Sequence, residues 1–163
     1  MQEVLIKNEG ITSRGKYDAF CDDEIVAQIA GHTQSPLFRL AKMMYSVEFE
    51  DAHCIEFRQS GQGFTIDHII YDIYRDEKQI GKVKRKSLKV SYEVAVDDGE
   101  FAIEHGWLTR GNIKYTNLHG NEIAIETGRS GLANWRINSE SELPQIDMAI
   151  VLFMRAMSEL MLR

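Results

Sequence analysis

Short alternating runs of hydrophobic and polar residues, separated by turn residues, fill the chain up to about residue 138. Residues 90–96, VSYEVAV, are one such run, and its hydrophobic side chains fall on one face of a strand because successive strand side chains point to opposite faces. Asp97-Asp98-Gly99 follows it and is typical of a hairpin turn. The pattern predicts about a dozen strands over residues 2–138.

The C-terminal residues follow a helical pattern instead, and we predict a helix over residues 142–162. This helix is apolar on nearly every side, so it needs a wall of other residues around it. Its longest uncharged run, residues 148–154, is far shorter than the about 20 residues that span a bilayer. The sequence therefore predicts a mainly β protein: a closed antiparallel β-barrel of about twelve strands around a hydrophobic C-terminal α-helix, in a single domain over residues 1–163.

A repeated unit strengthens this prediction. Residues 17–40 can be laid over residues 71–94, and a weaker third copy begins at Tyr115. Each copy reads as strand, tight turn, strand, loop, strand, and the third departs at Glu126, where the others have Ile or Val. In each copy a small residue follows a β-branched one, as a bend or the close approach of another backbone requires. These small residues are Ala27, Gly81 and Ala124.

Composition limits the classes of function. The net charge of −6 over 163 residues argues against nucleic acid as a partner, since the phosphate backbone demands a basic face. The N-terminal residues carry an acid, Glu3, and too short an apolar run for a secretory signal, so we expect a cytoplasmic protein.

One basic cluster stands out in this acidic chain. Six Lys and Arg residues lie within residues 78–89, with no acid among them. On a strand, Lys82, Lys84 and Lys86 share one face while Val83 and Arg85 share the other. Such a row of lysines would attract an anionic surface. The alternative is the solvated outer face of a strand, where lysines also discourage aggregation.

Candidate catalytic and metal-binding patterns are weak. The five histidines show no metal-ligand spacing, and no nucleophile elbow or phosphate-binding glycine loop occurs. Asp22-Asp23 and Asp97-Asp98 are paired carboxylates at turns, where Asp bonds its own backbone. Arg155 and Glu159 lie one helical turn apart and could satisfy each other inside a barrel. We predict no catalytic residue, cofactor or metal; an enzyme would need an open pocket with buried polar groups.

Residues 80–99, IGKVKRKSLKVSYEVAVDDG, are similar to a segment of Tubby proteins that reads I-G-K-L-R-S-N before an aromatic strand and an acidic-Gly turn. In the order of its elements the chain resembles the Tubby-like superfamily, which includes Tubby C-terminal domains, LURP-one-related proteins and phospholipid scramblases. The resemblance implies a closed barrel of about twelve strands threaded by its C-terminal helix.

The same resemblance implies a site. The matching strand of Tubby proteins carries a basic residue that contacts the phosphates of a phosphoinositide head group, and Lys84 holds that position here, with Lys82 as the lysine of the motif. The chain departs from the family in the preceding strand, residues 65–75, where Arg75 is the only strong base. It also lacks the proline-rich region and cysteine cluster of scramblases, so scrambling activity is not implied.

Our hypothesis is a non-enzymatic domain that binds anionic phospholipid head groups or a membrane surface through Lys82, Lys84, Arg85 and Lys86. It would be cytoplasmic and peripheral at the membrane. The alternative is a protein-interaction or structural module, such as a homodimer, with no lipid role.

Overall fold

The computed structural model describes residues 1–8, 16–33, 43–61, 70–86, 91–97, 99–105, 112–117, 122–128 and 134–161. These residues form twelve strands followed by one helix. The strands are β1 (Gln2–Asn8), β2 (Tyr17–Cys21), β3 (Glu24–Thr33), β4 (Met43–Phe49), β5 (Cys54–Gly61), β6 (Ile70–Arg75), β7 (Lys78–Lys86), β8 (Ser91–Val96), β9 (Gly99–His105), β10 (Asn112–Asn117), β11 (Glu122–Gly128) and β12 (Asn134–Ser139). The helix is α1 (Gln145–Met161).

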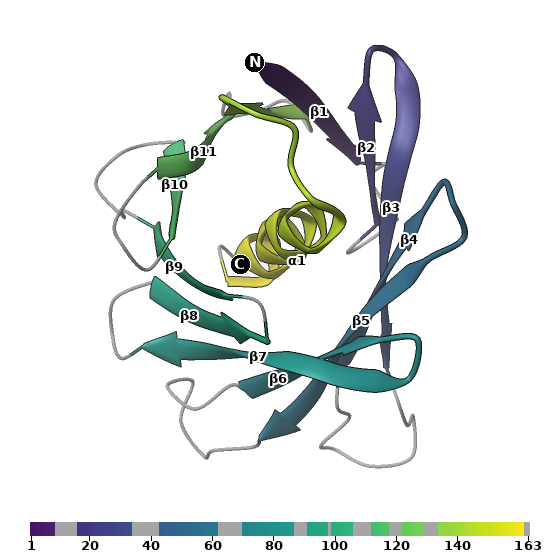
Figure 1. Cartoon of the computed structure of the whole chain (residues 1–163), viewed down its shortest axis with the longest axis vertical. Helices are drawn as coiled ribbons and strands as arrows, with labels where there is room; N and C mark the ends of the chain where they lie inside the picture. The colour runs from purple at the N-terminus through teal and green to yellow at the C-terminus, as the bar shows by residue number, and fades with distance from the viewer. Residues whose placement is uncertain are drawn as a thin grey trace.

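Every strand pairs antiparallel with the next strand of the chain, and the first strand has partners on both sides. β1 pairs with β2 along one edge and with β12 along the other, where Val4 lies opposite Ile137. Figure 1 shows the strands arranged around α1. The predicted antiparallel β architecture with a C-terminal helix packed against the sheet is confirmed.

The helix begins at Gln145, three residues later than predicted. Pro144 explains the difference, because the residue before a proline is driven away from helical backbone angles. The first helical bond runs from the backbone N–H of Met148 to the carbonyl of Pro144 (3.0 Å). The N–H of Leu143 instead donates to Oε1 of Gln2 at 2.8 Å, which ties the segment before the helix to the start of β1.

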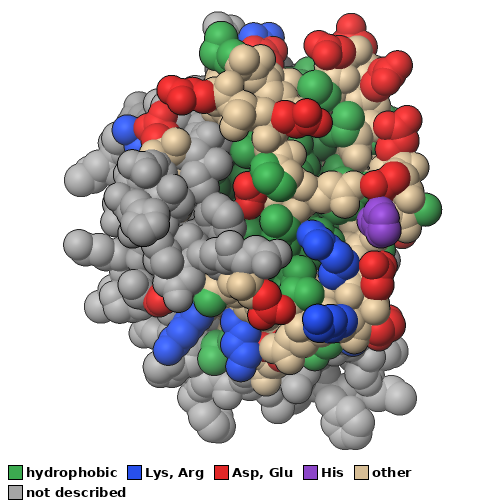
Figure 2. Space-filling view, in the orientation of Figure 1, with side chains coloured by type: hydrophobic (Ala, Val, Ile, Leu, Met, Phe, Trp, Pro, Cys, Tyr) green, Lys and Arg blue, Asp and Glu red, His purple; other side chains and the backbone are tan. Residues whose placement is uncertain are grey.

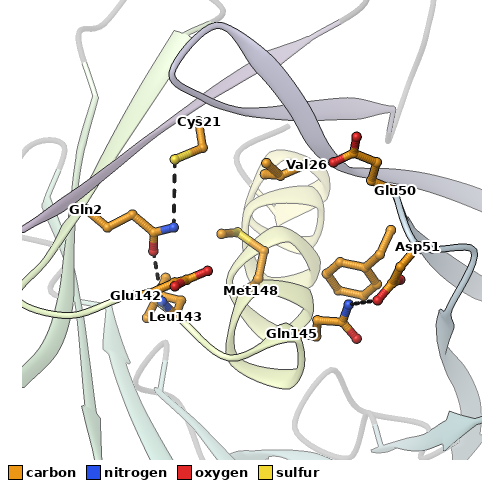
Figure 3. Close-up of a pocket in the computed structure, with 10 residues that line it drawn as sticks. Gln2, Cys21, Val26, Glu50, Asp51, Glu142, Leu143, Gln145 and Met148 are labelled. Carbon is orange, nitrogen blue, oxygen red and sulfur yellow. Dashed lines mark hydrogen bonds between the residues drawn. The ribbon is translucent and has the colours of Figure 1, made fainter.

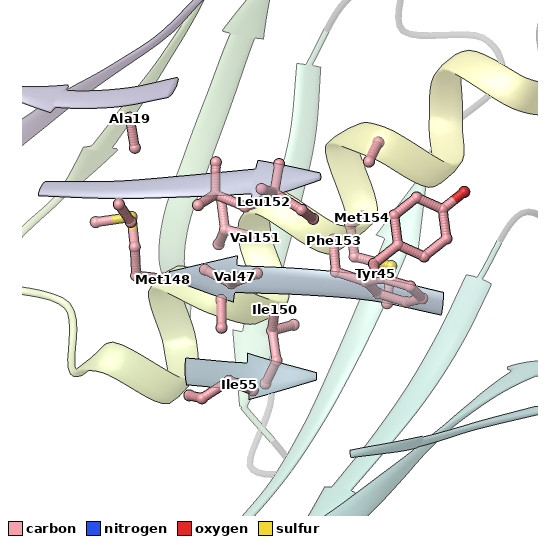
Figure 4. Packing of buried hydrophobic residues seen from close by; sticks show 14 of the residues in the cluster. Ala19, Tyr45, Val47, Ile55, Met148, Ile150, Val151, Leu152, Phe153 and Met154 are labelled. Atoms are coloured by element: carbon pink, nitrogen blue, oxygen red, sulfur yellow. The ribbon is translucent and has the colours of Figure 1, made fainter. Parts of the chain in front are cut away.

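The middle of α1 is buried on all sides. Residues 148–156, charged Arg155 included, are each less than a tenth exposed, as the apolar pattern predicted. Phe153 lies at the centre: its ring stacks on Phe57 with centroids 4.2 Å apart and meets Tyr45 and Tyr71 edge-on at 5.4 and 4.9 Å. Figure 4 shows Phe153 beside Tyr45 among helix side chains that face Val47 and Ile55. Burial of these side chains is the main stabilising term for the helix.

The repeated unit appears as hairpins with a bulge at the same place. In the β2–β3 hairpin Ala19 pairs with Ala27 but Phe20 pairs with Ile25, so Val26 is an extra residue. The β6–β7 hairpin repeats this pattern, with Gly81 in the place of Ala27 and Ile80 as the extra residue. The overlay of residues 17–29 on residues 71–83 is therefore confirmed. The overlay of the third strand is wrong, because Ile29 pairs with Val47 as Val83 pairs with Val94, so the equivalent of Val94 is Val47 and not Leu40.

The third copy is shifted from its predicted alignment. In the β10–β11 hairpin Tyr115 pairs with Ala124, and Ile123 is the extra residue. Tyr115 thus takes the place of Ala19 in the first copy, two residues beyond the expected match with Tyr17. The small residue was placed correctly because the bulge, rather than the tyrosine, is what the three copies share.

The β2–β3 and β6–β7 hairpins of the first two copies turn without glycine. Asp22 and Asp23 have positive φ of 50° and 66°, and Asp76 and Glu77 have 49° and 65°. Two consecutive left-handed residues match the right-handed twist of the flanking strands, as two-residue hairpins require. The turn predicted at Asp22-Asp23 is confirmed; Asp98 of the other predicted turn lies outside the described residues.

The close approach of β8 explains Gly81. A Cβ atom on Gly81 would lie 2.3 Å from the carbonyl oxygen of Ala95 and 3.0 Å from Cα of Val96, both backbone atoms of β8. Here the predicted close approach of another backbone is confirmed.

Candidate functional site

The predicted lysine row lies on β7, between β6 and β8. Lys82 and Lys84 are exposed, while Val83 between them is only 1% exposed and faces the core. The pairing continues through Arg85 and Lys86, which lie opposite Tyr92 and Ser91. The side chains of Arg85 and Lys86 lie outside the described part of the chain, so the structure brings together two of the four predicted residues.

Two acids accompany these lysines on the neighbouring strands. Asp72 lies opposite Lys82 in the pairing, with its Oδ1 3.9 Å from Nζ of Lys82. Glu93 lies opposite Lys84. The side chain of Lys82 is 62% exposed, so its contact with Asp72 is screened by water and contributes little to stability. On the outer face, the two described lysines of β7 are therefore flanked by one acid on β6 and one on β8.

The structure also has a pocket, lined in part by acidic residues, that the sequence did not predict. One end of the sheet is called the turn end. There β1 begins, the β2–β3, β4–β5, β6–β7 and β8–β9 turns lie, and the chain passes into α1. A pocket of about 490 Å³ opens there, called the turn-end pocket (Figure 3). It is lined by Gln2, Cys21, Val26, Phe49, Glu50, Asp51, Glu142, Leu143, Gln145 and Met148.

Two glutamines brace this pocket. Nε2 of Gln145 donates to Oδ2 of Asp51 at 2.6 Å, and this joins the start of α1 to the β4–β5 turn. Gln2 accepts from the N–H of Leu143 and directs its amide nitrogen to Sγ of Cys21 at 3.8 Å. The sequence analysis did not single out these residues, because residues 2, 51 and 145 meet only after folding. The paired carboxylates that it named, Asp22-Asp23 and Asp97-Asp98, are not among the lining residues.

A half-buried acid lies beside the pocket in the first turn of α1. Burial raises the pKa of Asp147 to about 6. Its Oδ1 atom is buried and accepts no hydrogen bond. Further along the helix, the guanidinium of Arg155 stacks on the Trp135 ring at 4.1 Å, and the side chain of its predicted partner, Glu159, lies outside the described residues.

Among the residues that the structure describes, no group of three or more His, Cys, Asp or Glu side chains could hold a metal ion. Within the same residues, no helix has the length and apolar character needed to cross a membrane.

No protein-family model matches the chain, and no curated protein matches its sequence. The chain is similar to a solved structure, the X-ray structure of a protein from Arabidopsis thaliana, AT5G01750, with a TM-score of 0.61 and 14% sequence identity. The match covers 99% of this chain and 91% of the Arabidopsis chain. The likeness is one of fold. Because one fold serves many functions, it carries over no ligand or activity.

Proposed function

We propose that the chain is a non-enzymatic Tubby-like domain of the LURP-one-related kind, in which the strands form a closed barrel around α1. We further propose that it binds anionic phospholipid head groups at a cytoplasmic membrane surface through Lys82, Lys84, Arg85 and Lys86. The full-length likeness to the Arabidopsis protein supports the first part. The exposure of Lys82 and Lys84 on the outer face of β7 supports the second, and it is the observation on which the site depends.

The β2–β3 hairpin provides an internal control for this site. The shared bulge makes Gln28 equivalent to Lys82 and Ala30 equivalent to Lys84, since Asp18 pairs with Gln28 as Asp72 pairs with Lys82. The two hairpins have the same backbone pattern, but only β7 carries lysines at these outward positions.

Vesicle flotation would test the proposal, with phosphatidylcholine vesicles that either contain or lack phosphatidylserine and phosphatidylinositol bisphosphate. The variant Lys82→Gln/Lys84→Ala gives β7 the residues of β3 and should weaken binding to anionic vesicles by about tenfold or more, since each lysine near a membrane contributes about 1 kcal/mol. A further Arg85→Ala/Lys86→Ala variant measures the share of the other two residues. The reverse variant, Gln28→Lys/Ala30→Lys, should strengthen binding. Equal binding to both vesicle types, or no loss in the first variant, would refute the lipid proposal.

A second candidate is a protein-interaction module without a lipid role. Asp72 and Glu93 favour it, because they partly neutralise the two lysines that the site needs. Light scattering on the purified protein distinguishes the candidates: a dimer with no response to vesicles supports the second, whereas a monomer that floats with anionic vesicles supports the first.

A further inference from the structure

We propose that the turn-end pocket is a docking site for a basic segment of a protein partner, which places an apolar side chain in the pocket and Lys or Arg side chains against its rim. The proposal does not depend on the lysines of β7. It rests on the cavity, on the chemistry of its lining and on the charge of the surface around it.

The cavity has the size and lining of a binding pocket. Its volume of about 490 Å³ lies within the usual range of about 300–1,000 Å³ for ligand pockets. Val26, Phe49, Leu143 and Met148 supply apolar lining. Phe49, Leu143 and Met148 are otherwise largely buried, so the lining is part of the packed core and is fixed in place.

Acids surround this apolar lining. Glu50, Asp51 and Glu142 line the pocket, and all three residues are exposed. In the described connections at the turn end, residues 22–23, 50–53, 76–77, 97 and 140–144, there are many carboxylates and neither Lys nor Arg. The acids are Asp22, Asp23, Glu50, Asp51, Asp76, Glu77, Asp97, Glu140 and Glu142. Figure 2 shows Asp and Glu side chains over the β2–β3 and β4–β5 turns, beside hydrophobic side chains in the middle of the face; Lys and Arg side chains lie on the lower part of the same face.

This distribution fits an extended cationic chain better than a single ion. The carboxylates are spread over separate turns, and no group of them among the described residues could hold a metal. Three of them already have partners: Asp51 accepts a bond from Gln145, Glu77 accepts one from Arg58, and Asp76 lies 3.7 Å from Nδ1 of His53. A surface rich in carboxylates attracts a cationic partner over several ångströms. The apolar pocket then gives that partner a fixed position.

The walls are set before binding. The bonds from Leu143 to Gln2 and from Gln145 to Asp51 hold the segment before α1 against β1 and the β4–β5 turn. A pocket that is already ordered loses less conformational entropy when a partner binds.

The test uses three fluorescein-labelled peptides and the full chain, with fluorescence anisotropy at low salt as the readout. The peptide KKLKK carries both proposed features, KKGKK lacks the apolar side chain, and EELEE reverses the charge. KKLKK should bind more tightly than KKGKK, its affinity should fall as salt is added, and EELEE should not bind. Absence of KKLKK binding, or equal binding of KKLKK and KKGKK, would overturn the proposal.

Two matched variants locate the site. Glu50→Lys/Glu142→Lys should weaken KKLKK binding by about tenfold, since each exposed charge contributes about 0.5–1 kcal/mol. Asp18→Lys/Glu48→Lys makes the same change in net charge on the outer face of β2 and β4, where both residues line a shallow groove, and should change binding by less than about threefold. Equal losses in both variants would mean that only net charge matters, and the pocket would be excluded.

A third variant tests the cavity itself. Val26→Trp places a large side chain in the pocket and should reduce KKLKK binding to the level of KKGKK binding. Thermal unfolding of each variant, followed by circular dichroism, identifies any that fail to fold. If Val26→Trp folds and still prefers KKLKK as the native protein does, the apolar side chain does not bind in this pocket.

Discussion

The β2–β3 and β6–β7 hairpins are two versions of one structure with different surfaces. Each turns through two left-handed acidic residues and has a one-residue bulge before a small residue, Ala27 in one and Gly81 in the other. Their outward residues differ, since Gln28 is replaced by Lys82. The comparison teaches that the features that shape the sheet are repeated, whereas the charges that a ligand would meet are specific to one copy.

The hairpins also contribute differently to the core. Tyr71 of the second hairpin meets the ring of Phe153 on the helix, while its equivalent in the first, Tyr17, meets Trp135 of β12 with centroids 5.6 Å apart. The tyrosine of the second hairpin thus joins an aromatic cluster on the helix, whereas the tyrosine of the first packs against β12, although β2 and β3 also lie against α1.

The largest expected effect concerns that cluster. Phe153→Ala should lower the free energy of unfolding by about 3–5 kcal/mol, because it removes a large buried ring. In double-mutant cycles measured by urea unfolding, Phe153→Ala should couple to Tyr71→Ala by about 0.5–1.5 kcal/mol and add to Tyr17→Ala within about 0.5 kcal/mol. Equal coupling to both tyrosines would mean that the hairpins contribute alike.

Next in size is the glycine of the second bulge. Gly81→Ala should cost about 1–3 kcal/mol, since its Cβ would overlap the backbone of β8. The matched change, Ala27→Gly, should cost at most about 1 kcal/mol, which is the usual cost of a more flexible backbone. The same denaturant series measures both. A stable Gly81→Ala variant would show that β8 moves away easily and that the two bulges are interchangeable.

A smaller effect is expected at the turn end that both hairpins share. The folded pKa of Asp147, about 6, lies above its ordinary value of 3.8, so the folded state binds the proton more tightly. The protonated Asp147 carboxyl therefore contributes fully to the free energy of unfolding below about pH 4, and this contribution is lost as the pH rises through 6. Allowing for partial exposure and for the favourable dipole of α1, the loss is about 1–2 kcal/mol.

Asp147→Asn should therefore be more stable than the native protein at pH 7.5 and equally stable at pH 3.5, as measured by urea unfolding at the two values. A constant difference at both values would show that the Asp147 carboxyl is not responsible. Because Asp147 lies outside both hairpins, this measurement separates changes in the helix from changes in the hairpins.

The smallest effect is expected in the turns. Asp23→Gly and Glu77→Gly should each raise the free energy of unfolding by about 0.5–1 kcal/mol, because glycine adopts the left-handed backbone without a steric cost. The φ angles of 66° and 65° agree, but Glu77→Gly also removes the hydrogen bond that Glu77 accepts from Arg58, so its gain should be the smaller of the two. Thermal midpoints compare the two variants, and a larger gain at Glu77 would contradict this expectation.

The sequence predicted the antiparallel strands, the buried helix and the outward direction of Lys82 and Lys84. It did not predict that Asp72 lies opposite Lys82. A hairpin that turns at Asp76-Glu77 without a bulge would place Asp72 opposite Gly81, and the extra residue, Ile80, moves the pairing on by one position. Similarly, the third copy was aligned on Tyr115 because a tyrosine is conspicuous in sequence, whereas the structure repeats the bulge.

The local sequence therefore determined which residues share a face. The alternation of side chains along a strand separates Val83 from its lysine neighbours, and the apolar run from Met148 to Met154 must be buried wherever it lies. Tertiary structure alone decided what lies beside each face. The register of β6 against β7 depends on one unpaired residue, Ile80. The first strand, β1, pairs with the last, β12. The turn-end pocket is lined by side chains that range from residue 2 to residue 148. Such contacts depend on the path of the whole backbone, because they join residues that no short stretch of sequence relates.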